Sequence, residues 1–294
     1  MKRFLTFGLG CLSLLTAYTQ ELTKAWQPLL TKDLNLWEVW MGVPHISVDL
    51  EGVEKSADVH VGTPLGLNND PKKVFSIIEE DGELLLAITG EIYGGLTTLD
   101  TYENYHFKTY FKWGDKKWAP RANAIRDNGI LYHCRGDHGA FWNVWKSSLE
   151  YQVQEDDMGD FISIANSYAD CLAEETTNAS GKQAYQFNPD GKWYTFHWPT
   201  NGYGLCSKPG SNEKPNGEWN LLEIIAIGDR SVHLVNGQLV NVVRDAKTII
   251  EGEPVALSSG QIQIQSEGAE CYYKGMEIRS MKRFPKEYKS YFKK

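Results

Sequence analysis

The chain has 294 residues, of which 41% are hydrophobic and 23% are charged. These values are typical of a globular protein and exclude a disordered chain, a collagen and a long coiled coil. The 38 acidic residues outnumber the 30 basic ones, for a formal net charge of -8. No nucleic-acid partner is therefore expected, because backbone binding needs clustered Lys and Arg. Abundant aromatic residues and 27 glycines favour strands, tight turns and sugar-stacking surfaces.

The start of the chain is typical of a secretory signal. Lys2 and Arg3 form a basic start, and residues 4–17 are mostly apolar and carry no charge. We expect residues 1–20 to be a signal peptide and residues 21–294 to be a single domain, exported to the periplasm or the cell exterior. An outer-surface lipoprotein anchored at Cys11 is less favoured, because the apolar run before it is very short. No other stretch is apolar enough to predict a transmembrane segment.

Four cysteines follow the predicted signal, namely Cys134, Cys171, Cys206 and Cys271. No Cys-x-x-Cys pair exists, so no structural zinc knuckle is expected. In an exported protein four cysteines allow three full disulfide pairings, and buried free thiols are an equally good interpretation. If one bridge forms, Cys171–Cys206 is the favoured pair, because both residues lie in loop-like sequence.

Strand signals follow an irregular excursion at residues 44–73. Residues 75–78 and 84–88 flank the turn Asp81-Gly82 and predict a hairpin. Residues 105–112, 129–134 and 149–154 alternate as strands do. Residues 219–227, 231–235 and 238–243 predict a three-stranded meander, closed by the hairpin signal Asn236-Gly237. Two more strands are expected at 261–265 and 272–279. Long helical periodicity is absent, so the sequence predicts an all-β sandwich or jelly roll.

Two predicted strands carry rows of polar side chains. Glu150, Gln152 and Gln154 point to one face of their strand. The same layout recurs at Gln261, Gln263 and Gln265, with Glu267 just beyond. A solvated outer face is one interpretation. Because Gln is poor in strands, the other is a surface that hydrogen-bonds hydroxyl groups.

His133 is the second candidate. Alternation puts it on one face with Leu131, while Ile130 and Tyr132 face the other way. A lone strand histidine is usually structural. Here Arg126 and Asp127 precede the strand and a polar loop follows it, and imidazole suits proton transfer near neutral pH. His133 and His138 have no recognised metal-ligand spacing.

Several motifs in this order make the sequence similar to one known family. They are Trp26-Gln27-Pro28-Leu29, residues 90–98 (GEIYGGLTT), 103–107 (ENYHF), 111–114 (FKWG), 127–133 (DNGILYH), 150–154 (EYQVQ), 159–161 (GDF), 217–220 (GEWN), 235–237 (VNG) and 263–268 (QIQSEG). The chain resembles the 3-keto-disaccharide hydrolase domain family over nearly its whole mature length. The resemblance implies a concanavalin-like jelly roll, a β-sandwich of two antiparallel sheets with a concave ligand face.

The resemblance also implies an activity. The substrate would be a glycoside oxidised at C3, cleaved by C2 proton abstraction, elimination at C1 and hydration. Many relatives carry Arg where this chain has His133, which makes His133 a candidate base. We expect His133 and Glu150 to be catalytic, Glu150 as acid or as metal ligand, and both to be the candidate ligands of one divalent metal ion.

The substrate-binding candidates come from the polar rows and from the motifs of the resemblance. They are Gln152, Gln154, Gln265, Glu91, Arg126, Asn220 and Glu267.

Two other functions compete with this one. A non-catalytic carbohydrate-binding module on the same fold would need only aromatic stacking and amide hydrogen bonds, and would bind a C3-oxidised disaccharide without cleaving it. A retaining glycosidase would need a second carboxylate beside Glu150. The alternate positions hold the amides of Gln152 and Gln154, which argues against that mechanism.

Overall fold

The computed structural model describes residues 25–198 and 204–293. The predicted signal peptide lies outside the described residues. Their regular structure consists of antiparallel strands and a 3-10 helix, η1 (Tyr291–Lys293), near the C-terminus. No helix in the described ranges has the length and apolar character needed to cross a membrane.

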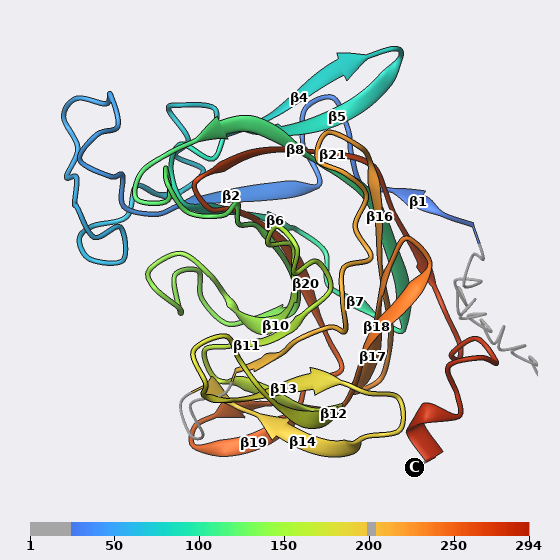
Figure 1. Ribbon diagram of the computed structural model, residues 1–294. Coiled ribbons are helices and arrows are strands. Elements are labelled where there is room, and N and C mark those ends of the chain that lie inside the picture. The colour runs from blue at the N-terminus through green and yellow to red at the C-terminus, as the bar shows by residue number, and fades with distance from the viewer. Residues whose placement is uncertain (1–24, 199–203, 294) are drawn as a thin grey trace, which may run out of the picture.

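The described strands form a 12-stranded outer sheet and a 9-stranded inner sheet. In Figure 1 the outer sheet wraps around the back of the inner one. The outer sheet has the order β13 (Gln183–Phe187), β12 (Ser167–Thr177), β18 (Gln238–Ile250), β17 (Arg230–Val235), β16 (Asn220–Ile227), β8 (Tyr105–Lys117), β21 (Ala269–Ser280), β5 (Glu83–Ile88) and β4 (Phe75–Glu80), with β1 (Gln27–Pro28), β14 (Lys192–Phe196) and β19 (Glu253–Ala256) pairing on β21, β12 and β18. The inner sheet has the order β15 (Leu205–Cys206), β11 (Phe161–Ile164), β10 (Ser147–Gln152), β9 (Gly129–Arg135), β20 (Ser259–Ser266), β6 (Gly94–Thr98), β2 (Trp37–Met41) and β3 (Gly66–Leu67), with β7 (Tyr102–Glu103) on β20. The predicted all-β jelly-roll sandwich is confirmed.

The core lies between the sheets and contains polar contacts as well as apolar ones. The Tyr132 hydroxyl on β9 lies 2.7 Å from Ser231 Oγ and 3.0 Å from His233 Nε2, both on β17. The Tyr151 hydroxyl on β10 donates to the Leu234 carbonyl at 2.9 Å. Burial lowers the pKa of His233 to about 4, so this imidazole is neutral and can accept at Nε2. These bonds satisfy buried polar atoms and fix one sheet over the other.

The predicted hairpins are confirmed. Asp81 and Gly82 have φ values of 52° and 80° and join β4 to β5. Asn236 and Gly237, at 51° and 77°, join β17 to β18. Such left-handed pairs match the twist of the flanking strands, which is why these dipeptides mark hairpins.

The four cysteines of the described residues are free and buried. Cys171 on β12 and Cys206 on β15 are close enough for their thiols to interact. The favoured pair is therefore brought together as thiols and not as a disulfide, and both residues lie in strands rather than in the predicted loops.

Candidate functional site

The face of the inner sheet turned away from the outer sheet is concave and carries the candidate site (Figure 1). Core residues such as Ile130 and Tyr151 point the other way, so the alternate residues line this face. Strand register aligns them in rows. The first row is Glu150, Leu131, Gln263, Thr97 and Glu38. The second row is Gln152, Gly129, Gln265, Gly95 and Trp40.

Two glycines in the second row, Gly129 and Gly95, leave space above the strands on the concave face. A Cβ atom at Gly129 would lie 2.7 Å from Gln265 Oε1 and closer still to Glu150 Oε1. A Cβ atom at Gly95 would lie 2.5 Å from Gln263 Nε2. Only glycine leaves room for these side chains to lie flat across the neighbouring strand. The sequence thus builds a floor on which Glu150 and Gln265 lie side by side.

A third row, just beyond the strand ends, contains Gln154, Asp127 and Glu267. Arg121, from the loop before β9, lies over it, with Nη2 2.7 Å from Asp127 Oδ2 and Nη1 3.7 Å from Glu267 Oε1. Gln154 Nε2 donates to Asp127 Oδ2 at 2.8 Å. We call Asp127, Glu150 and Glu267 the carboxylate cluster. The guanidinium of Arg121 faces two of the three carboxyls, and Glu150 has no such partner among the described residues.

The members of the carboxylate cluster differ in their affinity for protons. Burial raises the pKa of Asp127 to about 6, and the Arg121 charge opposes the rise. Burial, and then the charge of Asp127, raise the pKa of both Glu150 and Glu267 well above the usual range. Close carboxyls in a poorly solvated site cannot all ionise together. Asp127 is therefore the carboxyl of the cluster that ionises most readily, whereas burial favours the protonated forms of Glu150 and Glu267.

Two buried acceptor atoms at this place are unused. Among the described residues neither Asp127 Oδ1 nor Gln265 Oε1 has a hydrogen-bond partner. Buried acceptors in folded proteins are normally satisfied, so unused ones suggest that a ligand or water completes them. Asp127, Glu150 and Glu267 are 5%, 4% and 8% exposed, so the cluster has only a narrow opening to solvent.

His133 lies on the other face of the inner sheet. A β-bulge interrupts the alternation of β9: the register shifts against both β10 and β20, and His133 has a φ of 54°. Its ring packs on Tyr105 of the outer sheet, and its Nδ1 atom lies 3.2 Å from the Leu257 carbonyl. The prediction that His133 shares a cleft with Glu150 is wrong. Burial lowers the pKa of His133 to about 4, which makes it a weak base inside the sandwich.

The three predicted glutamines do lie on the concave face, in different ways. Gln265 lies against the Glu150 carboxyl and partly offsets the rise of its pKa. Gln152 turns back, because its amide oxygen accepts the Val153 amide at 2.8 Å. Gln154 follows the end of β10 and orients Asp127.

The remaining predicted binders have partners in other places. Glu91 Oε1 lies 3.1 Å from Lys72 Nζ, and Arg126 Nη1 lies 2.9 Å from Glu155 Oε1. Asn220 Oδ1 accepts from the Lys214 amide and from Asn236 Nδ2, both at 2.8 Å. The structure does not bring these three side chains into the carboxylate cluster. Glu267, in contrast, is a member of it.

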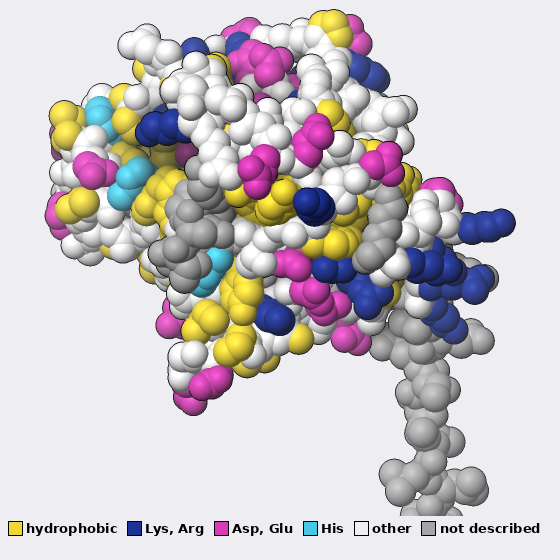
Figure 2. Space-filling view, turned by 60° about the horizontal axis from the view of Figure 1, so that its bottom comes forward, with side chains coloured by type: hydrophobic (Ala, Val, Ile, Leu, Met, Phe, Trp, Pro, Cys, Tyr) yellow, Lys and Arg dark blue, Asp and Glu magenta, His cyan; other side chains and the backbone are white. Residues whose placement is uncertain are grey.

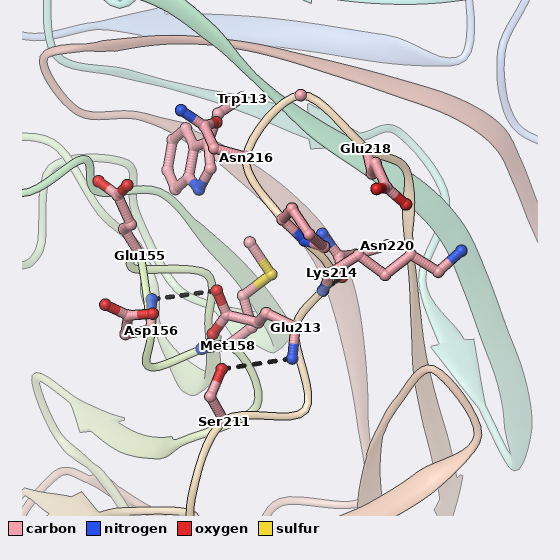
Figure 3. Close-up of a pocket in the computed structure, with 12 residues that line it drawn as sticks. Trp113, Glu155, Asp156, Met158, Ser211, Glu213, Lys214, Asn216, Glu218 and Asn220 are labelled. Carbon is pink, nitrogen blue, oxygen red and sulfur yellow. Dashed lines mark hydrogen bonds between the residues drawn. The ribbon is translucent and has the colours of Figure 1, made fainter.

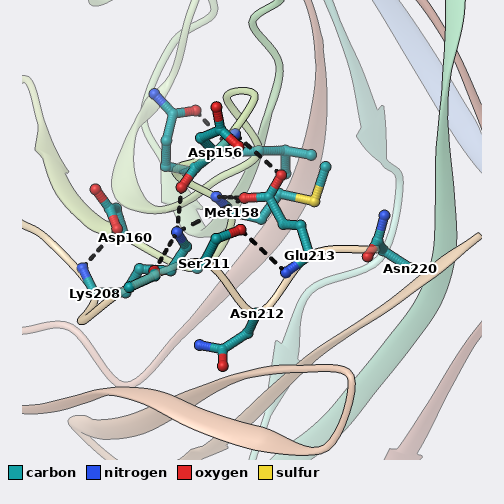
Figure 4. A network of polar contacts seen from close by, with 12 residues as sticks. Asp156, Met158, Asp160, Lys208, Ser211, Asn212, Glu213 and Asn220 are labelled. Carbon is teal, nitrogen blue, oxygen red and sulfur yellow. Dashed lines mark hydrogen bonds and ion pairs between the residues drawn. The ribbon is translucent and has the colours of Figure 1, made fainter. Parts of the chain in front are cut away.

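Asn220 lines a separate cavity of about 290 Å³, between the 155–158 and 211–218 loops (Figure 3). Its wall is held by Glu213, which accepts the Asp156 and Met158 amides at 3.0 and 2.9 Å. Lys208 Nζ donates to the Asp156 and Gly210 carbonyls beside it (Figure 4). These groups satisfy one another, and no member of the carboxylate cluster lines this cavity.

The predicted metal ligands do not fit a common ion. His133 and Glu150 lie on opposite faces of the inner sheet. Within the described ranges no group of three or more His, Cys, Asp or Glu side chains is placed to hold a metal ion. In the carboxylate cluster the positive charge comes from Arg121.

A comparison with protein families identifies the domain. The model of the 3-keto-alpha-glucoside-1,2-lyase-like domain matches residues 25–279. The chain belongs to this family. It is thus a member of a carbohydrate-active family, as the resemblance implied. The family match covers both sheets and all three rows of the concave face. No match was found among the curated proteins.

Solved structures with a similar fold share little sequence with this family member. A glycosyl hydrolase, itself described as putative, from Parabacteroides distasonis is 17% identical, with a TM-score of 0.45, covering 87% of this chain and 100% of that chain. A carbohydrate-binding module from Bacillus subtilis is 11% identical, with a TM-score of 0.41, covering 70% of this chain and 92% of that chain.

Asp127 of the carboxylate cluster and its partner Arg121 were not predicted as site residues. Asp127 lies two residues before Gly129, so continuing the strand alternation past the strand end would have placed it on the concave face. The same rule applies to Gln154 and Glu267. Arg121 lies in a loop without periodicity, and nothing in the sequence signals its contact with Asp127.

Proposed function

We propose that the protein is an enzyme that cleaves glycosides oxidised at C3, by C2 proton abstraction, elimination at C1 and hydration. Membership of the family supports this substrate class. The observation that carries the proposal is the carboxylate cluster, in which Arg121 favours the ionised form of Asp127 while burial favours the protonated forms of its neighbours. Carboxyl groups whose pKa values are set apart by their surroundings are typical of acid and base pairs.

The assigned roles follow from these proton states. The C3 ketone acidifies the C2–H bond, Asp127 takes the proton on Oδ1, and the electron pair forms an enolate. The ketone then re-forms as the C1–O bond breaks, and Glu150 gives its proton to the departing oxygen. In the hydration step the roles are reversed. Glu150 takes a proton from water as the hydroxyl adds to C1, and Asp127 returns its proton to C2. Both carboxyls are then reset.

Arg121 and Gln265 support this chemistry without exchanging protons. The guanidinium of Arg121 keeps Asp127 ionised and adds positive charge near the developing enolate. The free oxygen of Gln265 can accept a sugar hydroxyl, which would orient the ring over the low floor at Gly129. His133 takes no part in this scheme.

A carbohydrate-binding module is the second candidate, and one contact favours it. The short ion pair of 2.7 Å between Arg121 and Asp127 occupies the group that the enzyme needs as its base. A binding module would use the same floor as a hydrogen-bonding surface and would leave the sugar intact.

The test is incubation with a disaccharide oxidised at C3 and with its unoxidised parent. We expect release of the reducing-end sugar from the oxidised compound only, and exchange of its C2 proton with deuterium from solvent. Asp127→Asn should lose roughly 10²–10⁴-fold in turnover and should lose the exchange, as removal of a general base does. Glu150→Gln should slow sugar release by a similar factor and leave more of the exchange.

His133→Gln serves as the matched control, because this side chain lies on the opposite face. Its turnover should stay within a few-fold of the parent when the variant folds normally. Tight binding of the oxidised disaccharide without exchange or release would favour the binding module. Full activity of Asp127→Asn together with loss in His133→Gln would overturn the assigned roles.

Export is part of the proposal, supported by the signal-like residues 1–20. The protein recovered from the producing cells should begin near residues 18–21, as read by mass spectrometry of the N-terminal peptide. A start at Met1, or a lipid on Cys11, would contradict it.

A further inference from the structure

Lys146 lies on the concave face beyond the carboxylate cluster. It directly precedes β10, and its backbone amide donates to Gln263 Oε1 at 3.1 Å. Alternation along the strand puts its side chain on the same face as Ser148 and Glu150. The Lys146 charge also helps burial to lower the pKa of His138, which belongs to this side of the sheet. Lys146 is only 6% exposed.

The ammonium of Lys146 has no partner of its own. Among the described residues no acceptor within hydrogen-bond distance and no ion pair is found for its Nζ atom. The acid across the floor, Glu38, is already bound to His138, with 3.0 Å between Oε1 and Nε2. Most of the side chain is buried, while its ammonium tip keeps contact with solvent and is not among the buried polar atoms that lack a partner. The charge is therefore free to bind a negatively charged group of a ligand.

The surroundings of Lys146 form a surface of aromatic rings. Trp40 of the second row stacks on His138, with ring centroids 5.4 Å apart and planes 8° apart. Trp142, on the loop before Lys146, is 44% exposed and packs against His60 at 4.5 Å. Figure 2 shows hydrophobic and histidine side chains gathered on the left of the molecule, the side where Figure 1 places the 44–73 excursion. Flat aromatic faces of this kind are suited to packing on sugar rings.

The loop that carries Trp142 is held in a strained conformation. Trp142 and Asn143 have φ values of 53° and 60°, which are uncommon for residues with side chains. Asn143 fixes the strained backbone. Its side-chain Nδ2 donates to the His60 carbonyl at 2.8 Å, and its backbone carbonyl accepts from Trp40 Nε1 at 2.9 Å. Such strain is found where a side chain must be presented to a ligand.

Spacing along β10 separates Lys146 from the carboxylate cluster. Four residues at the rise of a strand place the Lys146 and Glu150 backbones about 13 Å apart. This span is longer than a pyranose ring, so the two side chains would contact neighbouring sugar units of one ligand.

We propose that Lys146, with Trp40 and Trp142 beside it, forms a subsite for a sugar unit that carries an anionic group, a carboxylate or a sulfate. The inference rests on the proposed function in so far as the concave face must bind a glycoside. A neutral hydroxyl could accept from Lys146, but an anion adds the attraction of opposite charges to the hydrogen bond. The protein would therefore prefer acidic disaccharides to neutral ones.

The test measures binding of three unoxidised probes by calorimetry, so that catalysis is not needed. The probes are a glucose–glucose disaccharide, its glucuronate–glucose counterpart and its 6-sulfated form. We expect at least one acidic probe to bind roughly 10–100-fold more tightly than the neutral one, the value of one charge-assisted hydrogen bond. Preference for the carboxylate or for the sulfate identifies the source of the anion.

Lys146→Met keeps the length and apolar stem of the side chain and removes the charge. It should abolish the preference for acidic probes and leave affinity for the neutral probe within about threefold. Lys192→Met, at an exposed position of the outer sheet, is the matched control and should change neither. Equal affinity for the three probes, a preference that survives Lys146→Met, or failure of every probe to bind at millimolar concentration would each overturn the subsite. Failure of the proposed lyase activity alone would leave the preference intact.

Discussion

Asp127 and Glu150 have the same functional group in surroundings that favour different proton states. Asp127 has Arg121 at 2.7 Å, which offsets much of the effect of burial. Glu150 has an amide beside it and the charge of Asp127 nearby, so nothing of comparable strength opposes its burial. The sequence alone contains both carboxyls but not this difference, because the difference depends on which residue faces Arg121.

The pH profile of the proposed reaction follows from Asp127. Its pKa of about 6 is that of the base, which must be ionised to take the C2 proton. We expect kcat/KM on a C3-oxidised disaccharide to fall as the pH drops through about 6, approaching a tenfold loss per unit below it. A second fall should appear at higher pH, where Glu150 loses its proton. A rate that stays constant from neutral pH down to the unperturbed range of Asp would contradict Asp127 as the base.

Removing the guanidinium should move that profile. Arg121→Gln takes away the charge that lowers the pKa of both Asp127 and Glu267. The acidic limb of kcat/KM should therefore shift to higher pH by about a unit or more, with activity at pH 7 falling at least about twofold. Arg121→Lys keeps the positive charge, so its pH profile should stay close to that of the parent protein. If the acidic limb does not move in Arg121→Gln, Arg121 does not control the pKa of the base.

At the scale of elements, β9 shows where sequence patterns succeed and where they stop. Alternation correctly predicted the strand and the facing of Leu131 and Tyr132. One extra residue in the bulge then reverses the expected face of His133, and such a bulge has no marker in the sequence here. The exposed end of β12 was missed for a related reason: acidic and Thr residues such as Glu174 and Thr176 carry no hydrophobic alternation, because they lie exposed on the outer sheet.

The glycine of β9 offers a test of the floor. Gly129 has an ordinary strand conformation, so Gly129→Ala strains no backbone, but the new Cβ would displace Glu150 and Gln265. We expect turnover to fall roughly 100-fold, because displacements of about 1 Å in a catalytic group have that effect, while the Tm falls by less than about 5 °C. Turnover on a C3-oxidised disaccharide and calorimetry measure the two effects.

Gly114→Ala on β8 is the matched control. Its Cβ would also crowd a flexible side chain, at 2.5 Å from Glu270 Cγ, but on the outer sheet. It should keep normal turnover with a similar change in Tm. Equal loss of activity in both variants would mean that the effect comes from general destabilisation.

For the whole molecule, buried titratable groups of opposite kinds set the dependence of stability on pH. The pKa of Asp160 is raised by burial to about 8, and those of Glu150 and Glu267 are also raised. Between the usual carboxyl range near pH 4 and about pH 8 the folded state then binds more protons than the unfolded one, so stability is lost progressively as the pH rises over that window. His133 and His233 have pKa values lowered to about 4, so their contribution is lost as the pH falls from about 6.5 to 4.

Below about pH 6.5 the two trends oppose each other, whereas above it only the carboxyl trend remains, so the Tm should fall between about pH 6.5 and 8. Calorimetry from pH 4 to 9 is the measurement. Asp160→Asn, which cannot ionise, should make the fall of Tm up to about pH 8 shallower, because one of the protons released on unfolding is removed. A Tm that climbs steadily to pH 9 would show that these carboxyls are solvated in the folded protein.

The tyrosine hydroxyls that cross the interior have a consequence for recognition. A slip of one sheet over the other by a single residue would unpair Tyr132, Tyr151 and His233 together, each of them buried. The curvature of the inner sheet is therefore fixed during folding, before any sugar arrives. Binding should need side-chain rotations at Arg121 and Gln154 but no rearrangement of the strands, so amide hydrogen exchange in β9, β10 and β20 should be almost equally slow with and without ligand.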